Sequence, residues 1–207
     1  MGVHSAEGTV VLMADFVLGL DLDGVCGDYT SEFRRHVSRA TGTPEVDLPD
    51  PTHWSFAESG WGITEEQFAD LHRVAVRNGM FRAMPVFDGA AEALWELSDA
   101  DVHIRVITHR LVTKQLHQVS VTDTVTWLDS HNIPYRDVCF VANKSKVDAD
   151  VYLDDAPHNI TSLRAAGRDV IVFSAPYNQH ISGPRANTWV EVRDMVLERL
   201  EKFNAAK

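Results

Sequence analysis

The chain has 207 residues, of which 44% are hydrophobic and 24% are charged, and its formal net charge is −11. This length and composition suit a soluble globular protein with one domain, or one domain with a modest insertion. The acidic balance argues against a nucleic-acid polymer as partner, because such a partner needs a basic face, but it remains compatible with a small phosphorylated substrate.

The N-terminal region shows no sign of export. The apolar run at residues 10–20 has no basic flank before it and carries Asp15 in its middle, so it is not typical of a signal peptide. No stretch is long enough to span a membrane, and we therefore expect a cytoplasmic protein. Residues 9–13 are interpreted as a short extended lead-in or a tail. The two cysteines, Cys26 and Cys139, are too few for a disulfide scaffold and are expected to be small buried side chains.

The first predicted element is a strand at residues 16–20, where every position is apolar or glycine, as in a strand covered on both faces. It ends in Asp21 and Asp23, followed by Gly24 and Gly27, which allow a sharp turn. Ligands of parallel sheets bind outside the carboxyl ends of strands, and carboxylates this close together require a cation or a shared proton. Taken alone, the stretch is either a site or an ordinary acidic turn.

Residues 28–83 are predicted to form a small, mostly helical cap inserted after the first strand. A first helix, with Phe33 and Val37 on its apolar face, stops before Gly42. A second helix begins at the capping box that starts at Thr64 and ends near residue 79. The connection between the two helices is expected to be a loop that is unusually rich in aromatic residues.

From residue 84 onward, helices and strands alternate. Strands are predicted at residues 103–108, 137–141, 149–153 and 169–173, with helices between them and an amphipathic helix at the C-terminal end. This alternation predicts an α/β fold with a doubly wound parallel sheet and right-handed crossovers. Residues 1–27 and 84–207 would form this core domain.

Polar side chains follow several of these strands. They are, in chain order, Asp21, Asp23, Thr108, Lys144, Lys146, Asp154 and Asp155. Because the carboxyl ends of parallel strands share one edge of the sheet, these groups are expected to converge. Carboxylates with a hydroxyl and an ammonium indicate Mg²⁺ held by oxygen ligands, with a phosphate as the third partner.

The chemistry follows from the charges. Asp21 would attack phosphorus and form an aspartyl-phosphate once a cation neutralises the phosphate. Asp23, two residues on and pointing the same way, would protonate the leaving oxygen and then deprotonate the hydrolytic water. Thr108 and a lysine would hold the phosphoryl oxygens as charge redistributes.

This order of motifs resembles the haloacid dehalogenase-like hydrolases over nearly the whole chain, and residues 28–83 fall where that superfamily inserts its helical cap. Within the superfamily, the chain is most similar to the 5′(3′)-deoxyribonucleotidase group. The additional shared features are Asp28, Phe81 before Pro85, and Lys144 ten residues before Asp154. The resemblance implies a Rossmann-like core with a cap after the first strand.

The resemblance also implies roles for the acidic residues. Asp21 would be the nucleophile and a metal ligand, and Asp23 the general acid and base with its backbone carbonyl facing the metal. Asp154 would bind Mg²⁺ with Asp155 in support. The presence of Asp23 favours a phosphatase over dehalogenase, phosphonatase or pump chemistry.

Thr108 would bind the phosphate and Lys144 would stabilise it, with Lys146 as the competing lysine that the spacing disfavours. The chain departs from the group at His109-Arg110, where a small hydroxyl residue followed by proline is more common. Arg110 either adds a second phosphate contact or lies in solvent at a helix start. His109 is placed to touch the substrate.

Trp54 and Phe81 are the candidates for stacking on a base, although they could equally belong to the core of the cap, and Trp61 is assigned to that core. Asn178, after the last predicted strand, either helps to close the site or forms a turn. The favoured function is a Mg²⁺-dependent phosphomonoesterase that acts on (deoxy)nucleoside 5′-monophosphates.

Three alternatives stay open at this point: a phosphatase of another small phosphomonoester such as a sugar phosphate, a phosphoacceptor signalling module, and a catalytically silent nucleotide-binding homologue. The base, the sugar and the oligomeric state, with a homodimer among the options, are left open.

Overall fold

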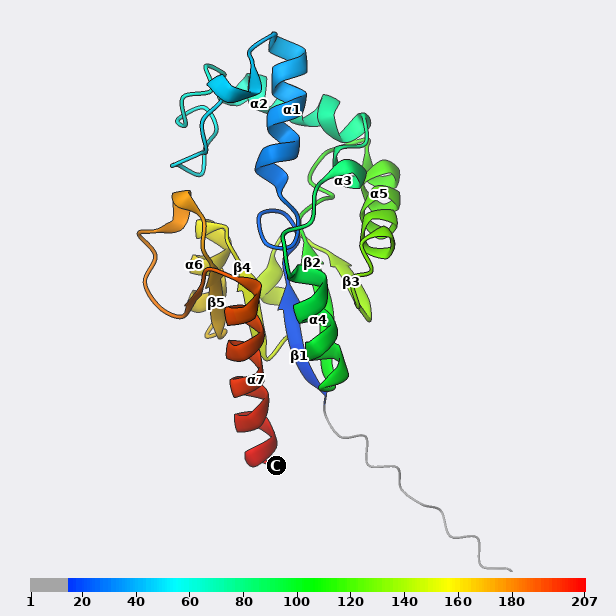
Figure 1. The fold of residues 1–207 in the computed structure, drawn as a ribbon, viewed down its shortest axis with the longest axis vertical. Coiled ribbons are helices and arrows are strands. Elements are labelled where there is room, and N and C mark those ends of the chain that lie inside the picture. The colour runs from blue at the N-terminus through cyan, green and yellow to red at the C-terminus, as the bar shows by residue number, and fades with distance from the viewer. Residues whose placement is uncertain (1–14) are drawn as a thin grey trace, which may run out of the picture.

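A computed structural model describes residues 15–207, so the lead-in expected at residues 9–13 lies outside the described part (Figure 1). The strands of this part form one six-stranded parallel sheet in the order β3-β2-β1-β4-β5-β6. They are β1 Phe16–Leu20, β2 Val102–Thr108, β3 Asp137–Phe140, β4 Val151–Asp154, β5 Val170–Phe173 and β6 Arg185–Ala186. The prediction of a doubly wound α/β fold is confirmed. The two-residue strand β6 was not predicted, because two residues carry no periodicity.

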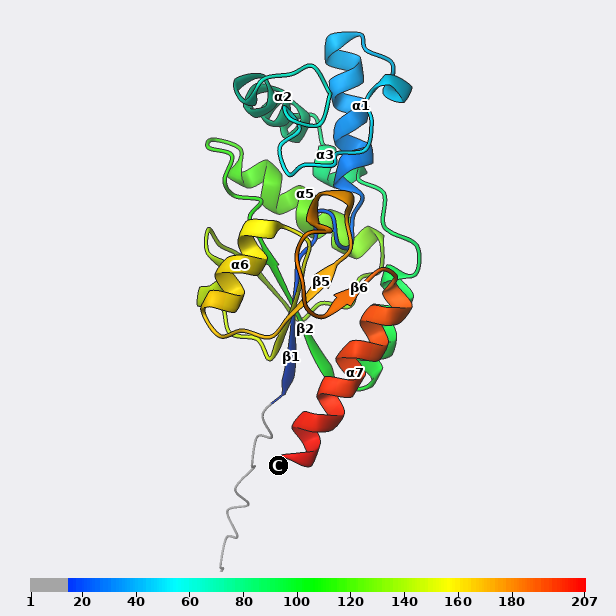
Figure 2. The same ribbon diagram turned by 90° about the vertical axis from the view of Figure 1, so that its left-hand side faces the viewer.

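The α-helices are α1 Tyr29–Thr41, α2 Glu65–Arg77, α3 Met80–Ala83, α4 Ala90–Asp99, α5 His117–Ser130, α6 Pro157–Ala165 and α7 Trp189–Ala205. Short 3-10 turns lie at Glu45–Asp47, Lys144–Lys146 and Pro176–Asn178. Helices α4 and α7 cover one face of the sheet and α6 the other, while α1 and α2 stand beyond its carboxyl edge (Figure 2). No helix within residues 15–207 is long and apolar enough to cross a membrane.

Strand β1 occupies the middle of the sheet, where Leu18 and Leu20 are fully buried. It pairs with β2 on one side and with β4 on the other, so the order of the strands reverses at this point. Such a switch point leaves a crevice at the carboxyl ends of the two diverging strands. The apolar sequence of β1 therefore places Asp21 at the position in the sheet where a ligand is accommodated.

The region beyond the carboxyl edge has its own hydrophobic cluster, separate from the clusters that pack on the sheet. Trp61 belongs to this cluster, with its ring stacked on Phe33 at 5.9 Å and its Nε1 donating to the Pro49 carbonyl at 2.7 Å. The assignment of Trp61 to a core is thus confirmed. The separate cluster supports our proposal that residues 28–83 form an inserted cap.

The two connections between the sheet and this region lie side by side. Asp28 accepts a hydrogen bond from the Ser31 amide at the start of α1, and its own amide donates to the Pro85 carbonyl at 2.8 Å. The predicted capping box at Thr64 is present at the start of α2. The short helix α3 was not predicted, because four residues are too few to show a helical period.

Candidate active site

Three carboxylates from two strand ends meet at the switch point. Asp21 follows β1, Asp154 ends β4, and Asp155 comes next; oxygen atoms of all three lie within 4.8 Å of one another. All three side chains are buried. The sequence predicted metal ligands at Asp21, at Asp154 and at Asp23 through its backbone carbonyl, with Asp155 in support. In the structure the three clustered carboxylates are those of Asp21, Asp154 and Asp155, and the Asp23 side chain turns elsewhere.

Lys144 lies between two of these carboxylates. Its Nζ is 2.7 Å from Asp21 Oδ1 and 2.7 Å from Asp154 Oδ2. Burial alone would lower the pKa of Lys144, but Asp154 and Asp21 raise the pKa above its ordinary value, so the side chain is an ammonium. Lys146, on the same turn, is exposed to solvent. The geometry thus favours Lys144 over Lys146 as the lysine of the site.

A divalent cation fits this cluster. Burial raises the pKa of Asp21 to about 7 despite the opposing effect of Lys144, and Asp154 and Asp23 raise it further. Burial, together with Asp21 and Asp154, raises the pKa of Asp155 well above its ordinary value, and Asp155 Oδ1 is buried without a hydrogen-bond partner. One ammonium does not balance three buried carboxylates, and oxygen donors of this kind suit Mg²⁺.

Asp154 and Asp155 are each held by the chain around them. Asn159, in the first turns of α6, donates to both oxygens of Asp154 at 3.2 and 3.3 Å. The Tyr177 hydroxyl donates to Asp155 Oδ2, and Asn178 Nδ2 donates to the Asp155 carbonyl oxygen at 2.8 Å. Asn178 therefore belongs to the turn at Pro176–Asn178 and also connects the loop after β5 to Asp155. The sequence had left these two roles as alternatives.

Because Gly24 has no side chain, the Asp155 carboxylate can lie directly beside it. Its φ is +81°, and a Cβ at this position would lie 2.9 Å from Asp155 Cγ and 3.0 Å from the Tyr177 hydroxyl oxygen. A side chain at position 24 would have to displace the Asp155 carboxylate. The positive φ also disfavours any residue other than glycine there.

We expect Gly24→Ala to lower kcat/KM about tenfold or more, because it shifts a carboxylate of the site. The positive φ adds a loss of stability of about 1–3 kcal/mol. Gly42→Ala is the matched control, since Gly42 also has a positive φ of +76° but no atom within 4 Å of a Cβ. Steady-state kinetics and thermal unfolding of both variants test this; equal activity of the two would contradict it.

The Asp23 carboxylate faces Arg110 and not the other carboxylates. Arg110 Nη2 is 2.6 Å from Asp23 Oδ1, and Nε is 3.1 Å from both carboxylate oxygens. The guanidinium lies 4.4 Å from the centre of the Phe81 ring and 5.7 Å from that of Trp127, and its side chain is fully buried. The alternative that placed Arg110 in solvent is therefore wrong.

Arg110 also contacts the residue that precedes it by two positions. Its backbone amide donates to Thr108 Oγ1 at 3.3 Å, and its Nη1 donates to Thr124 Oγ1 of α5 at 3.2 Å. Thr108 itself is fully buried at the end of β2 and is not among the residues that line the cavity described next. Its assignment to phosphate binding remains a proposal.

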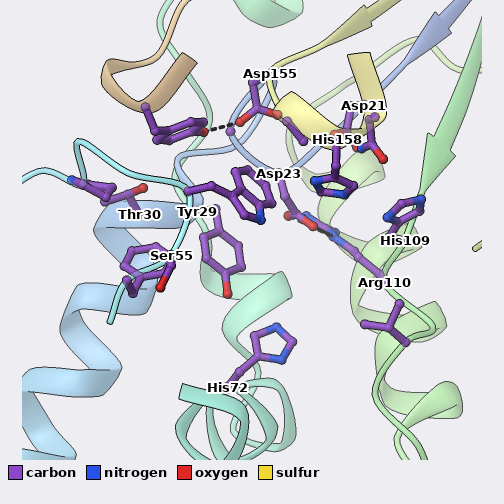
Figure 3. A pocket seen from close by; sticks show the side chains of 18 of the residues that line it. Asp21, Asp23, Tyr29, Thr30, Ser55, His72, His109, Arg110, Asp155 and His158 are labelled. Carbon is purple, nitrogen blue, oxygen red and sulfur yellow. Dashed lines mark hydrogen bonds and ion pairs between the residues drawn. The ribbon is translucent and has the colours of Figure 1, made fainter. Parts of the chain in front are cut away.

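A cavity of about 390 Å³ extends from the carboxylates toward α1 and α2 (Figure 3). Asp21, Asp23, Lys144 and Asp155 line one part of it. Aromatic side chains line much of the rest, namely Tyr29, Trp54, Phe56, Phe68, Phe81 and Tyr177, together with His72, His109 and His158. The cavity thus joins a charged end to an aromatic one.

The two predicted stacking residues occupy different places in this cavity. Trp54 is 49% exposed and meets the rings of His158 and Tyr177 edge-on, at 5.1 and 5.4 Å between centroids. Phe81 is 2% exposed and belongs to the cluster around Trp61, with Arg110 over its ring. Trp54 therefore presents a larger free surface to a ligand than Phe81 does.

His109 lines the cavity, and its Nε2 is buried without a hydrogen-bond partner. The centres of the His109 and His158 rings are 6.2 Å apart. Tyr29, His72, Tyr177 and His158 are among the lining residues that were not predicted from the sequence. The only available signal was position: Tyr177 precedes Asn178, and His72 follows Phe68 by one helical turn.

Known proteins are similar to this chain over most of its length. The sequence profile of the family described as 5′ nucleotidase, deoxy (Pyrimidine), cytosolic type C protein matches residues 15–202. A protein of Chlorobaculum tepidum named "Putative 5′(3′)-deoxyribonucleotidase" is 42% identical over 193 residues, which are 92% of this chain and 95% of that protein. The 5′(3′)-deoxyribonucleotidase of Bacillus subtilis is 24% identical over 187 residues, covering 87% and 98%.

Solved structures share the fold. A structure described as a predicted phosphatase from Clostridium acetobutylicum has a TM-score of 0.61 and 16% identity, covering 90% of this chain and all of that one. A haloacid dehalogenase-like family hydrolase from Streptococcus pneumoniae has a TM-score of 0.60 and 14% identity, covering 87% and 98%. At these identities the likeness extends to the fold alone.

Proposed function

The chain belongs to the family of cytosolic type C 5′ nucleotidases, and on that basis we propose that it is a Mg²⁺-dependent phosphatase of (deoxy)nucleoside 5′-monophosphates that acts through an aspartyl-phosphate. The observation that carries the proposal is the separation of its two motif carboxylates. Asp21 lies with Lys144 among the buried carboxylates, whereas Asp23 faces Arg110, and both line one cavity. Two carboxylates in different surroundings can take different roles, one as nucleophile and one as acid and base.

Asp21, Asp154 and Asp155 are the side chains that would hold the cation, and the bound Mg²⁺ would offset the negative charge of the phosphate. An Asp21 oxygen then forms the new bond to phosphorus while the bond from phosphorus to the ester oxygen breaks. Asp23 gives its proton to that leaving oxygen and later takes one from the water that hydrolyses the aspartyl-phosphate. Lys144 stays within reach of the phosphoryl oxygens throughout.

The lining of the cavity supports a nucleotide over a sugar phosphate. Six Phe, Tyr or Trp side chains line the cavity beside its charged end, and planar bases stack well on such surfaces. The lysine and the arginine that line the cavity, Lys144 and Arg110, already face carboxylates. Burial lowers the pKa of His72, His109 and His158, so these side chains add no charge for a second phosphate.

A substrate panel with and without Mg²⁺ tests the proposal. We expect phosphate release from nucleoside monophosphates to depend on Mg²⁺ and to be stopped by a chelator. We expect nucleoside diphosphates and simple sugar phosphates to react more slowly by about tenfold or more. Faster turnover of sugar phosphates than of every nucleotide would favour the alternative phosphatase, and release that persists without a divalent cation would contradict the role of Mg²⁺.

Mg²⁺ should also stabilise the protein, because it relieves the repulsion among three buried carboxylates. At about 100 times its Kd, a ligand of the folded state adds about 2.7 kcal/mol, which corresponds to a rise in Tm of roughly 5–10 °C for a chain of this size. Thermal unfolding with increasing Mg²⁺ measures the shift. Asp154→Asn should lose most of it, and an equal shift in that variant would place the binding elsewhere.

A further inference from the structure

The aromatic end of the cavity contains an imidazole without a protein partner. His72 of α2 is half-buried and stacks on Phe68 at 5.8 Å, with Tyr29 and Phe81 each at 6.1 Å between ring centres. Among the hydrogen bonds and ion pairs of residues 15–207, none uses a ring nitrogen of His72. Burial in this aromatic surrounding lowers the pKa of His72, so the ring is neutral and offers one donor and one acceptor.

Tyr29 brings a second polar group to the same place. It opens α1, directly after Asp28, and its ring packs against Phe33 at 5.7 Å and Phe56 at 6.1 Å. Within the described residues its hydroxyl has no hydrogen-bond partner, and burial raises the pKa of Tyr29 well above its ordinary value. Figure 3 shows this hydroxyl on the side of the cavity where His72 lies, away from Asp155.

Two half-buried histidines that do not line the cavity, His103 and His36, have carboxylate partners. His103 Nε2 is 2.8 Å from Asp137 Oδ2, and His36 Nε2 is 3.4 Å from Glu32 Oε1. A histidine with a structural role in an apolar cluster satisfies its nitrogens in this way, because an unpaired polar group in apolar surroundings costs free energy. His72 and Tyr29 instead direct unpaired groups into a cavity, which is the arrangement of a binding surface.

The complement of this surface is a flat ring whose edge carries both N–H groups and carbonyl or ring-nitrogen acceptors. The rings around His72 provide the stacking surface, while the imidazole and the phenol provide the donors and acceptors. The bases of nucleotides have this chemistry, whereas a sugar has no flat face and a plain aryl group has no polar edge.

We propose that His72 and Tyr29 read the hydrogen-bonding edge of the substrate's base and thereby set the preference of the enzyme among nucleotides. This inference rests on the proposed nucleotidase function, since it assumes that the phosphate occupies the end of the cavity at Asp21. Both residues are specificity determinants and take no part in the chemical steps.

The experiment compares nucleotides with the sugar phosphate that they share, so that the presence and the identity of the base are the variables. We measure kcat/KM for the four deoxynucleoside 5′-monophosphates and for 2-deoxyribose 5-phosphate, with Mg²⁺, in the full-length wild type and in His72→Phe and Tyr29→Phe. In each variant, kcat/KM for the preferred nucleotide should fall about tenfold or more. For 2-deoxyribose 5-phosphate it should stay within about twofold, because no base is there to be read.

Two further variants separate recognition from structure. His72→Gln keeps a donor and an acceptor and should recover part of the nucleotide activity that His72→Phe loses. His36→Phe is the matched control, because His36 is a half-buried histidine of the same region that pairs with Glu32 and does not line the cavity. His36→Phe should leave unchanged the ratio of kcat/KM for the preferred nucleotide to kcat/KM for 2-deoxyribose 5-phosphate.

The inference would be overturned if His72→Phe lowered kcat/KM equally for the nucleotides and for 2-deoxyribose 5-phosphate. It would also be overturned if neither variant changed the ranking of the nucleotides. Wild-type protein that hydrolyses 2-deoxyribose 5-phosphate as fast as every nucleotide would also overturn it and leave the phosphatase activity standing. Wild-type protein that releases phosphate from none of these substrates would instead contradict the proposed function.

Discussion

Asp21→Asn is expected to lower kcat by roughly 10⁴-fold or more, since the amide that replaces the carboxylate cannot attack phosphorus. Asparagine has nearly the same shape, and the substitution removes one of three buried negative charges. The fold should therefore persist, with a Tm close to that of the wild type. Lys144 keeps Asp154 as a partner at 2.7 Å.

Phosphate release from the preferred nucleotide and thermal unfolding together test this expectation. Asp47→Asn is a suitable control, because Asp47 is an exposed carboxylate far along the chain from the site and does not line the cavity. A residual activity above about one hundredth of the wild type, reproduced in independent preparations, would rule out Asp21 as the nucleophile.

Arg110→Met is expected to lower both activity and stability. Methionine fills part of the space between Phe81 and Trp127 but leaves Asp23 without its guanidinium. Breaking a buried ion pair costs about 3–5 kcal/mol, and because the Asp23 side chain is 28% exposed, we expect a smaller cost of about 2–3 kcal/mol. This corresponds to a fall in Tm of roughly 5–10 °C.

The activity should fall about 100-fold, because the acid and base of the reaction loses the group that orients it. The activity of Arg110→Lys should lie between those of the wild type and Arg110→Met. An ammonium keeps the charge but lacks the planar fork that meets both carboxylate oxygens. Arg105→Met is the matched control: Arg105 pairs with Asp137 at 2.7 Å on the sheet and does not line the cavity. Loss of Tm with unchanged kcat in Arg110→Met would show that the contact with Asp23 has only a structural role.

Much of the fold could be predicted from local patterns. The apolar run of β1, the Thr64 capping box and the alternation after residue 84 correspond to β1, α2 and the α/β core. Strand ends were predicted to within a few residues because burial on both faces makes parallel strands continuously apolar. The elements that escaped prediction, α3 and β6, are too short to carry a period of their own.

The meeting of Asp21, Lys144 and Asp154 was also predictable, because parallel strands end at one edge of the sheet whatever the length of chain between them. The direction of individual side chains along that edge was not. Asp23 follows Asp21 by two residues and was expected to point the same way, yet its carboxylate faces Arg110. Asp155, which was expected only to support the site, lies in the carboxylate cluster with Asp21 and Asp154.

The sequence by itself therefore determined the type of sheet, the edge at which the site lies and the family to which the motifs point. These depend on hydrophobic periodicity and on residue order, both of which can be read from the chain. Only the tertiary structure decided which groups share the cavity. The burial of Arg110 between Phe81 and Trp127 and the pairing of His72 with Tyr29 depend on contacts between distant segments, which sequence spacing does not encode.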